Sequence, residues 1–398
     1  MTAAGSIGRE SALGRAPATV CGVGAVTGYG WGRKRLWDGL ESGESAVVPS
    51  TGWKESLGHD VAYLAQVADV PHEGDPRSRF ARAMSTSVDE AIDDATERGW
   101  KPGPVVGLIH AVVLGEVDGW HEFYMERDQH VSRSEYLRLM PSTIMSMQMQ
   151  AHGFHGPAMA VGAMCASGNA AMLTAKMWLD AGVCSDVVVV ATDLSGTPGN
   201  IRHFVDLGVL FVDRPPFEAC RPFQTDSLGF LAGEASVAFV LSRQPEPAYL
   251  KVLGGAMTHD GFHAASINPD HAEIRRCFEF AVADARINPA DVQYLNAHGP
   301  GTAQCDAVEA SMLDSMFPEA HGVFSVKPLT GHCQGAASAV ELAAACRAFE
   351  TGVIPAPRAV APGHPRLLSG PTPRKPGIML KSSIGIGGHN SVLALEDV

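Results

Sequence analysis

The stretch Val161-Gly162-Ala163-Met164-Cys165-Ala166-Ser167-Gly168-Asn169-Ala170-Ala171 places a cysteine where an apolar approach ends and a helix of small residues begins. The helical pattern continues over residues 171–178. A cysteine at such a position meets free backbone N–H groups and the positive end of the helix dipole, which favour the thiolate and lower the thiol pKa from about 8.5. We therefore predict that Cys165 is a nucleophile suited to thioester chemistry.

Two later segments strengthen this prediction, because each carries a histidine next to glycine. They are Asn296-Ala297-His298-Gly299-Pro300-Gly301-Thr302 and Lys327-Pro328-Leu329-Thr330-Gly331-His332. Taken singly, a small buried cysteine or a histidine beside glycine is usually structural. One cysteine followed by two such histidines, in this order, instead predicts a single site.

Composition narrows the class of protein. The 398 residues are 45% hydrophobic, enough for one large core or two similar halves. Eight cysteines without a Cys-x-x-Cys pair predict neither a disulfide framework nor a zinc site, and we expect no metal and no cofactor. The first twenty residues carry Arg9, Glu10 and Arg15, which are not typical of a secretory signal, and no run is long enough to span a membrane. We expect a cytoplasmic protein.

The charge is acidic, with a net value of −13, which argues against nucleic acid as a partner. Two basic islands stand out against this background: Arg33-Lys34-Arg35, and the trio Arg77, Arg79 and Arg82. Either could steer a small acidic protein toward the surface, although a solvated helix face is the commoner explanation for a single island.

The order of patterns predicts an α/β protein made of two related halves, 1–254 and 255–398. Similarity between two segments of the chain supports duplication. Residues 165–182 and residues 331–352 each run from a glycine-rich turn through an alanine-rich helix to a glycine. We expect these two helices to pack closely, and the Met-rich tract 119–150 to form a helical covering over a pocket. Strands are predicted at 19–27, 105–114, 187–191, 234–241, 249–256, 292–296 and 378–382, and helices at 35–40, 80–98, 171–178, 272–285 and 305–316.

Taken in order, these motifs resemble those of the elongating β-ketoacyl-acyl-carrier-protein synthases of the thiolase superfamily. The resemblance begins at Gly22-Val23-Gly24-Ala25-Val26-Thr27 and includes the Cys165 turn, Arg221-Pro222-Phe223, Gly233-Glu234-Ala235, Thr258-His259-Asp260, both histidine segments and Gly385-Ile386-Gly387-Gly388-His389-Asn390. It implies a thiolase-like fold with duplicated βαβαβαββ halves in five layers (αβαβα).

The resemblance also implies roles for individual residues. Cys165 would accept the acyl group, and His298 and His332 would hold the donor thioester and drive its decarboxylation. Lys327 resembles the lysine that accompanies the second histidine in the family, and Glu309 its acidic partner. The N–H groups of Cys165 and Ile386 would form the oxyanion hole.

Substrate and partners are implied in the same way. Thr302, Pro300, Ile384, Ile386 and Asn390 fall at positions that would contact substrate. The partner would be an acyl carrier protein bearing a phosphopantetheine thioester, or an acyl-CoA. We also expect a homodimer, or a dimer with a related subunit.

Two departures from the family pattern predict a specialised enzyme. Pro300 replaces a threonine, which removes a hydroxyl and a backbone N–H from the loop that meets the pantetheine arm. Ile384 and Ile386 stand where the family has phenylalanines, so we expect an acyl pocket of different shape and weaker gating.

The function predicted is β-ketoacyl synthesis by decarboxylative Claisen condensation, in a polyketide or unusual fatty acyl pathway. An alternative is an acyltransferase of the same fold that passes the acyl group to an alcohol or amine without decarboxylation. A dinucleotide site at Gly22-Val23-Gly24 is disfavoured, because the glycine spacing does not match the Rossmann fingerprint. The sequence leaves open the acyl chain, the extender unit, carrier protein versus coenzyme A, the nature of the dimer and the pathway.

Overall fold

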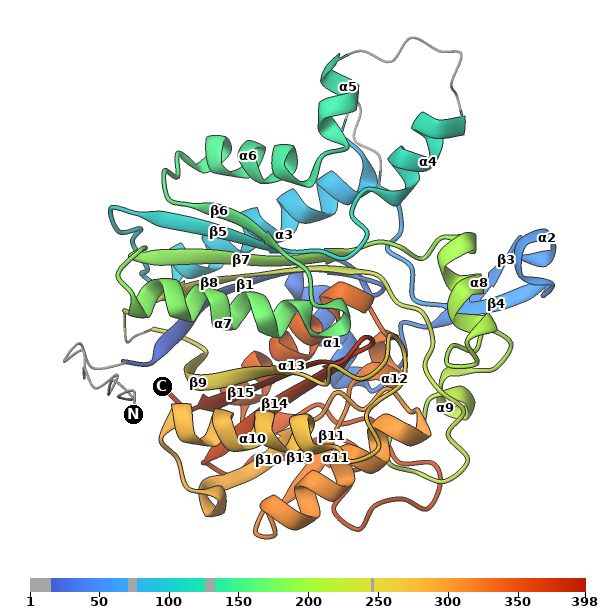
Figure 1. Cartoon of the computed structure of the whole chain (residues 1–398). Coiled ribbons are helices and arrows are strands. Elements are labelled where there is room, and N and C mark those ends of the chain that lie inside the picture. The colour runs from blue at the N-terminus through green and yellow to red at the C-terminus, as the bar shows by residue number, and fades with distance from the viewer. Residues whose placement is uncertain (1–15, 71–76, 126–132, 245–246) are drawn as a thin grey trace, which may run out of the picture.

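The computed structural model describes residues 16–70, 77–125, 133–244 and 247–398, and within these ranges its main sheet has 11 strands. The sheet consists of two halves that meet where β1 (Ala18–Thr27) pairs with β9 (Leu250–His259) (Figure 1). From β1 the first half runs through β8 (Ala235–Ser242), β7 (Asp186–Asp193), β5 (Val106–Ala111) and β6 (Ala158–Val161). From β9 the second runs through β15 (His389–Glu396), β14 (Ile378–Gly385), β10 (Val292–Asn296) and β11 (Gly322–Phe324).

Both halves follow the same order along the chain, βαβαβαββ. The helices of the first half are α3 (Arg79–Glu97), α6 (Pro141–His152) and α7 (Ser167–Asp180). Those of the second are α10 (Ala272–Ala285), α11 (Ala303–Met316) and α13 (Ala337–Thr351). Strand directions also correspond: β1–β8–β7 and β9–β15–β14 are antiparallel, whereas β7–β5–β6 and β14–β10–β11 are parallel. The predicted duplication and thiolase-like fold are confirmed.

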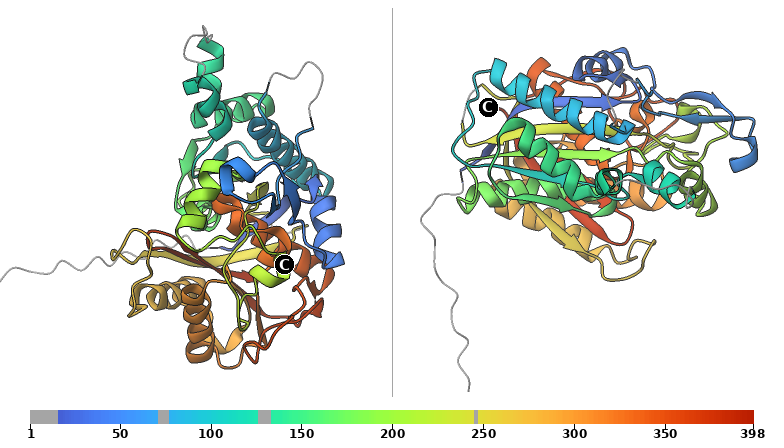
Figure 2. Two further views of the ribbon diagram at one scale, coloured as in Figure 1. Left: turned by 90° about the vertical axis from the view of Figure 1, so that its right-hand side faces the viewer. Right: turned by 90° about the horizontal axis from the view of Figure 1, so that it is seen from above.

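The elements stack in five layers. Helices α7 and α13 lie between the two halves of the sheet, while α3 and α6 cover one outer face and α10 and α11 the other (Figures 1 and 2). A Cβ added at Gly168 would lie 2.6 Å from Ser338 Oγ, so the start of α7 touches α13 with no room for a side chain. The predicted close packing of the two alanine-rich helices is thus confirmed, and it brings Cys165 next to the second half.

Burial follows from this layering. Strands β5, β7 and β8 are buried along their whole length, because helices cover both faces of the sheet. The uninterrupted valine run at 187–190 belongs to the most central of these strands and is typical of such a position.

The remaining elements connect these layers or form small sheets. They are β2 (Gly30–Trp31), α1 (Arg33–Ser42), β3 (Val48–Thr51), α2 (Lys54–Leu57), β4 (Val61–Leu64), α4 (Val117–Met125), α5 (Arg133–Arg138), α8 (Pro198–Asp206), α9 (Pro216–Ala219), α12 (Lys327–Thr330), β12 (Val353–Ile354) and β13 (Thr372–Pro373), with single turns η1 (Met164–Ala166), η2 (Pro289–Asp291) and η3 (Gln334–Ala336).

Three expectations differ from the structure. The boundary at 254/255 falls inside β9, so the second half begins by Leu250. The chain forms a further strand, β15, after the glycine-rich turn that follows β14, where no strand is predicted. The tract 119–150 is helical as predicted, but none of its described residues lines the Cys165 cavity, and residues 126–132 lie outside the described ranges. None of the described helices combines the length and the apolar character needed to cross a membrane.

Candidate active site

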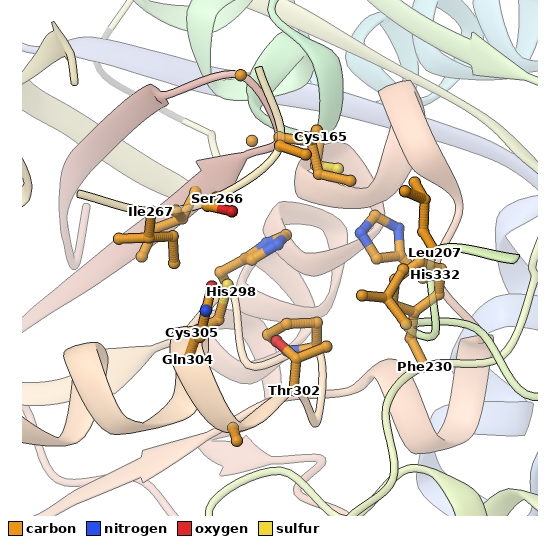
Figure 3. A pocket seen from close by; sticks show the side chains of 18 of the residues that line it. Cys165, Leu207, Phe230, Ser266, Ile267, His298, Thr302, Gln304, Cys305 and His332 are labelled. Atoms are coloured by element: carbon orange, nitrogen blue, oxygen red, sulfur yellow. The ribbon is translucent and has the colours of Figure 1, made fainter. Parts of the chain in front are cut away.

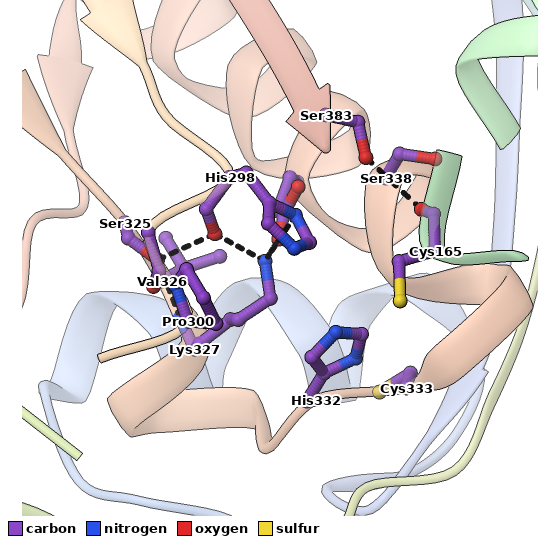
Figure 4. A network of polar contacts seen from close by, with 12 residues as sticks. Cys165, His298, Pro300, Ser325, Val326, Lys327, His332, Cys333, Ser338 and Ser383 are labelled. Atoms are coloured by element: carbon purple, nitrogen blue, oxygen red, sulfur yellow. Dashed lines mark hydrogen bonds and ion pairs between the residues drawn. The ribbon is translucent and has the colours of Figure 1, made fainter. Parts of the chain in front are cut away.

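Cys165 sits in η1, the tight turn between β6 and α7. Met164 before it has a φ of 49°, an uncommon left-handed conformation for a side chain of this size. Hydrogen bonds hold the turn: the Ser167 hydroxyl donates to Met164 O at 2.6 Å and accepts from the Ala163 N–H at 2.8 Å. From β14, Ser383 Oγ donates to Cys165 O at 3.0 Å (Figure 4). Cys165 is therefore positioned by both halves of the molecule.

The second half supplies both histidines. His298 follows β10 and His332 follows α12, and their rings lie 5.5 Å apart between centroids at an angle of 82°. One ligand atom from each of Cys165, His298 and His332 lies within 4.8 Å of the other two, and all three residues are buried. Figure 3 shows the two imidazoles facing a common cavity beneath Cys165. The structure brings the three predicted residues together.

Hydrogen bonds define which nitrogen of each imidazole carries the proton. The Gln334 N–H donates to His332 Nδ1 at 3.0 Å, so Nδ1 is an acceptor there. The Lys327 ammonium lies 3.3 Å from His298 Nδ1 and can only donate. In both neutral rings the proton therefore resides on Nε2, which leaves Nε2–H as the group available to a substrate oxygen.

The surroundings keep both imidazoles uncharged. Burial is the largest cause that lowers the pKa of His298 well below its usual value, and the charges of Lys327, His332 and Lys381 act in the same direction. Burial and Lys327 likewise lower the pKa of His332. Neutral histidines are suited to donate a hydrogen bond without carrying an acidic proton.

The predicted low pKa of Cys165 is wrong. Burial raises the pKa of this thiol to about 11, although the Ile386 N–H and the Lys327 charge oppose the rise. The sequence showed a helix start but not the depth at which the sulfur lies, and removal from water disfavours the anion more than these groups favour it. The resting sulfur is therefore a thiol.

The predicted pairing of Lys327 with Glu309 is also wrong. Lys327 forms its ion pair with Glu341 of α13. It also donates to His298 O, so it accompanies the first histidine (Figure 4). Glu309 instead accepts from the backbone N–H groups of His298 and Gly299 at 2.8 and 2.7 Å. Its carboxylate shapes the histidine loop, which is a positioning role.

The turn between β14 and β15 lies against the nucleophile. A Cβ at Gly385 would be 2.9 Å from Ala163 O and 3.3 Å from Cys165 N, so only glycine permits this approach. The N–H of Ile386 then faces the Cys165 sulfur. Together with the Cys165 N–H, it is the pair of donors expected to hold a tetrahedral oxyanion.

The cavity has a volume of about 560 Å³ and leads from the three catalytic candidates to the surface. Thr302, Pro300, Ile384 and Ile386 line it, in agreement with their predicted positions. Asn390 does not line it: its side chain donates to Asp260 Oδ1 at 2.7 Å and ties β15 to the end of β9. Asn390 is thus structural, because its side chain points toward the neighbouring strand.

Four further residues in or beside this site were not predicted from the sequence. Phe230 packs on His332 with ring centroids 4.7 Å apart, and His263 lines the cavity from the loop after β9. Glu341 and Lys381 are buried ion-pair partners beneath the histidines. Each of the last two is a lone charge in an apolar run, Ala337-Ser338-Ala339-Val340-Glu341-Leu342 and Ile378-Met379-Leu380-Lys381, and that pattern could have identified them.

This fold, with a cysteine and two neutral histidines at the junction of its halves, defines a thiolase-like acyl-transferring enzyme. Residues 16–246 match the family model described as Beta-ketoacyl synthase, N-terminal domain, and residues 249–360 match Beta-ketoacyl synthase, C-terminal domain. The chain belongs to the β-ketoacyl synthase family.

Individual members of this family are similar to the chain over most of its length. A chloroplastic 3-oxoacyl-[acyl-carrier-protein] synthase II of Arabidopsis thaliana is 31% identical, over 96% of this chain and 77% of its own. The tetracenomycin polyketide synthase ketoacyl synthase alpha subunit of Streptomyces glaucescens is 30% identical, over 84% and 85%. Nodulation protein E of Rhizobium leguminosarum bv. trifolii is 27% identical, over 95% and 98%.

Solved structures show the same fold. A ketosynthase complex described as type II PKS acyl-carrier protein with its ketosynthase has a TM-score of 0.83 at 22% identity, covering 96% of this chain and 100% of that one. A ketosynthase in complex with its chain length factor from Xenorhabdus doucetiae has a TM-score of 0.82 at 22% identity, with coverage of 98% and 100%.

Proposed function

We propose that this protein condenses an acyl group held on Cys165 with a malonyl-type thioester, releasing CO₂ and a β-ketoacyl thioester. The observation that carries the proposal is the pair of neutral imidazoles, His298 and His332, whose Nε2–H donors share a cavity with the Cys165 sulfur. A simple acyl transfer needs one oxyanion hole, whereas stabilising an enolate needs a second set of donors. This site has both.

In the first half-reaction the Cys165 sulfur attacks the carbonyl of an acyl thioester. The tetrahedral oxyanion is held by the N–H groups of Cys165 and Ile386. As it collapses, the bond to the carrier sulfur breaks, and the proton lost by Cys165 ends on the departing thiol. One thioester replaces another, so the step is close to isoenergetic.

In the second half-reaction the donor's carboxylate leaves as CO₂, and the electron pair of the broken bond forms an enolate. His298 and His332 donate from Nε2 to the enolate oxygen. The enolate carbon attacks the acyl carbon on Cys165, the oxyanion collapses, and the sulfur leaves as a thiolate. One proton is consumed to restore the thiol, which a pKa of about 11 favours.

The proposal is tested by supplying an acyl thioester first and a malonyl thioester second. Intact mass of the protein should rise by the acyl group and return to its starting value as CO₂ and a product two carbons longer are formed. The Cys165→Ala protein should show neither change. Acyl transfer to an alcohol or amine with no CO₂ released would support the alternative activity instead.

A carrier protein with a phosphopantetheine arm is the donor that suits this cavity. Thr302 at the start of α11 is half-buried in its lining, where a hydroxyl can meet the amide groups of such an arm. The basic trio is a poor docking site, because Arg79 pairs with Glu234 and Arg82 with Asp69. A coenzyme A thioester offers the same arm, and comparing KM values for the two donors distinguishes them.

A dimer, with itself or with a related subunit, is part of this proposal. Strand β6 is the outermost strand of the first half and carries exposed apolar residues, including Met159. Strands with free edges of this kind pair readily with another chain.

A cytoplasmic location is supported by the eight cysteines, all of which are free thiols. The departures at Pro300, Ile384 and Ile386 favour a specialised polyketide or fatty acyl pathway.

A further inference from the structure

A second lysine lies beneath the catalytic histidines. Lys381 is in the middle of β14 and its side chain is 0% exposed. Its strand neighbours at the same level are Asn296 of β10 and Leu393 of β15. Its Nζ lies 2.6 Å from Glu341 Oε2 and also contacts Ser382 O. A buried lysine in an apolar strand is costly unless it is paired, so this position calls for an explanation.

Glu341 is shared by two cations. Lys327 binds its Oε1 and Lys381 its Oε2, so the carboxylate bridges α12 and β14. A second carboxylate, Glu309 of α11, is tied to the same strand through Ser382 Oγ at 2.5 Å. The buried set therefore contains two carboxylates and two ammonium groups. Without Lys381, two acidic groups would share one cation.

Both acidic groups and both lysines connect to the histidines. Lys327 contacts Nδ1 and the carbonyl of His298, and Glu309 receives the N–H of the same residue. Burial is the largest cause that lowers the pKa values of His298 and His332, and the charge of Lys381 acts in the same direction. Burial raises the pKa of Glu309, and the charge of Lys381 opposes that rise. The side-chain amide of Asn169 in α7 donates to the backbone carbonyl of Lys381 at 3.2 Å.

We propose that Lys381 is a positioning residue of the condensation reaction: by sharing Glu341 with Lys327 it balances the buried charge and keeps both histidines neutral donors. The inference rests on the proposed function, since it assigns this task to the same site. Lys381 is not one of the residues that line the cavity. It acts through Glu341, Lys327 and the histidine loop.

Neutrality of the histidines matters for the outcome of the reaction. A protonated imidazole beside the enolate would transfer its proton to the enolate carbon. Because the malonyl thioester has already lost CO₂ to form this enolate, the protonated product would be an acetyl thioester, with no bond formed to the acyl group on Cys165. A loss of Lys381 should therefore appear as CO₂ release without condensation, and most strongly at low pH.

The test compares Lys381→Met and Lys381→Gln with the wild type. The matched control is Lys176→Met, because Lys176 is also buried and shares a carboxylate, Asp180, with a second cation, Arg243. At about pH 6 we expect condensation to fall by about tenfold in the Lys381 variants and to recover partly at about pH 8.5, with a rising fraction of acetyl thioester toward acid pH. Lys176→Met should keep the wild-type profile and product ratio.

Several outcomes would overturn the inference. If the Lys381 variants lose thermal stability but keep the wild-type pH profile and ratio of acetyl to condensed product, Lys381 is only structural. NMR of the imidazole groups in the wild type adds a test that needs no variant: a His298 or His332 that becomes protonated above about pH 6 contradicts the proposal even if no Lys381 variant folds. If the wild type does not condense at all, the proposed function fails, and the same NMR titration in Lys381→Met still decides whether Lys381 controls histidine protonation.

Discussion

The Nζ of Lys327 lies 3.3 Å from Nδ1 of His298, and this contact determines what the histidine can do. Because an ammonium only donates, Nδ1 must accept, and the proton of the neutral ring is held at Nε2. The same ammonium is anchored by its ion pair with Glu341, a residue that does not line the cavity. A lysine outside the cavity lining thus selects the tautomer of a histidine that lines it.

Replacing Lys327 by methionine should separate the two half-reactions. Acylation of Cys165 depends on the oxyanion hole and should remain within about threefold of wild type, whereas decarboxylation loses an oriented donor and should fall by about 10²–10³. Mass spectrometry of the acyl-enzyme and CO₂ release measure the two rates. Equal losses in both would show that Lys327 supports the fold of the whole site.

The raised pKa of Cys165 predicts how its reactivity depends on pH. Since burial raises the pKa to about 11, the thiolate fraction should grow about tenfold per pH unit between about pH 7 and 10. Alkylation by iodoacetamide, followed on the intact protein and corrected with Cys165→Ser, should follow that slope. A rate that levels off below about pH 8 would instead indicate a thiolate stabilised at the helix start.

Glu341 should be a strong determinant of stability. The variant Glu341→Gln leaves Lys327 and Lys381 buried without their shared carboxylate, which should lower the free energy of unfolding by about 3–5 kcal/mol. Asp180→Asn is the control, because its side chain is 22% exposed and its loss should cost about 1 kcal/mol. Urea denaturation of both proteins makes the comparison.

His110 predicts a loss of stability in acid. Its side chain on β5 is fully buried beside Phe80, and neither ring nitrogen has a hydrogen-bond partner among the described residues. Burial lowers its pKa from 6.5 to about 4. Below pH 6.5 His110 binds a proton in the unfolded chain but not in the folded protein. Its contribution to the free energy of unfolding is therefore fully present above pH 6.5 and declines toward pH 4 by about 3 kcal/mol.

Replacing His110 tests whether this residue causes the loss of stability in acid. His110→Leu removes the titrating group and should flatten the unfolding free energy between about pH 6.5 and 4, without loss of stability at neutral pH. The buried His298 and His332 will still contribute to acid sensitivity, so the measured quantity is the difference between variant and wild type. An unchanged slope would mean that His110 is not the group responsible.

The hydroxyls of the first histidine loop should control KM for the donor. Thr302→Val removes a lining hydroxyl and should raise KM about fivefold, the equivalent of one hydrogen bond. Pro300→Thr, which adds a hydroxyl and a backbone N–H, should lower KM by a similar factor. Neither change should alter the rate of CO₂ release at saturation, because neither residue reaches the reacting carbons.

Much of the architecture could be predicted because local patterns agreed with the final packing. The strand at 292–296 and the helix at 272–285 match β10 and α10 at both ends. Cys165, His298 and His332 carried enough local context to be placed in one site. The errors concern partners and environment: the carboxylate of Lys327, the pKa of Cys165 and the side-chain direction of Asn390 depend on which distant segments pack beside them.

The order of residues alone determined the class of fold and the three groups proposed to perform the chemistry, because hydrophobic periodicity and glycine-flanked turns are local properties of the chain. The tertiary structure alone decided how those groups are charged. Lys327 meets Glu341, and Lys381 joins them, only because α12, α13 and β14 converge at the junction of the two halves. Burial acts on a group through everything that surrounds it, and those surroundings come from segments far apart in sequence.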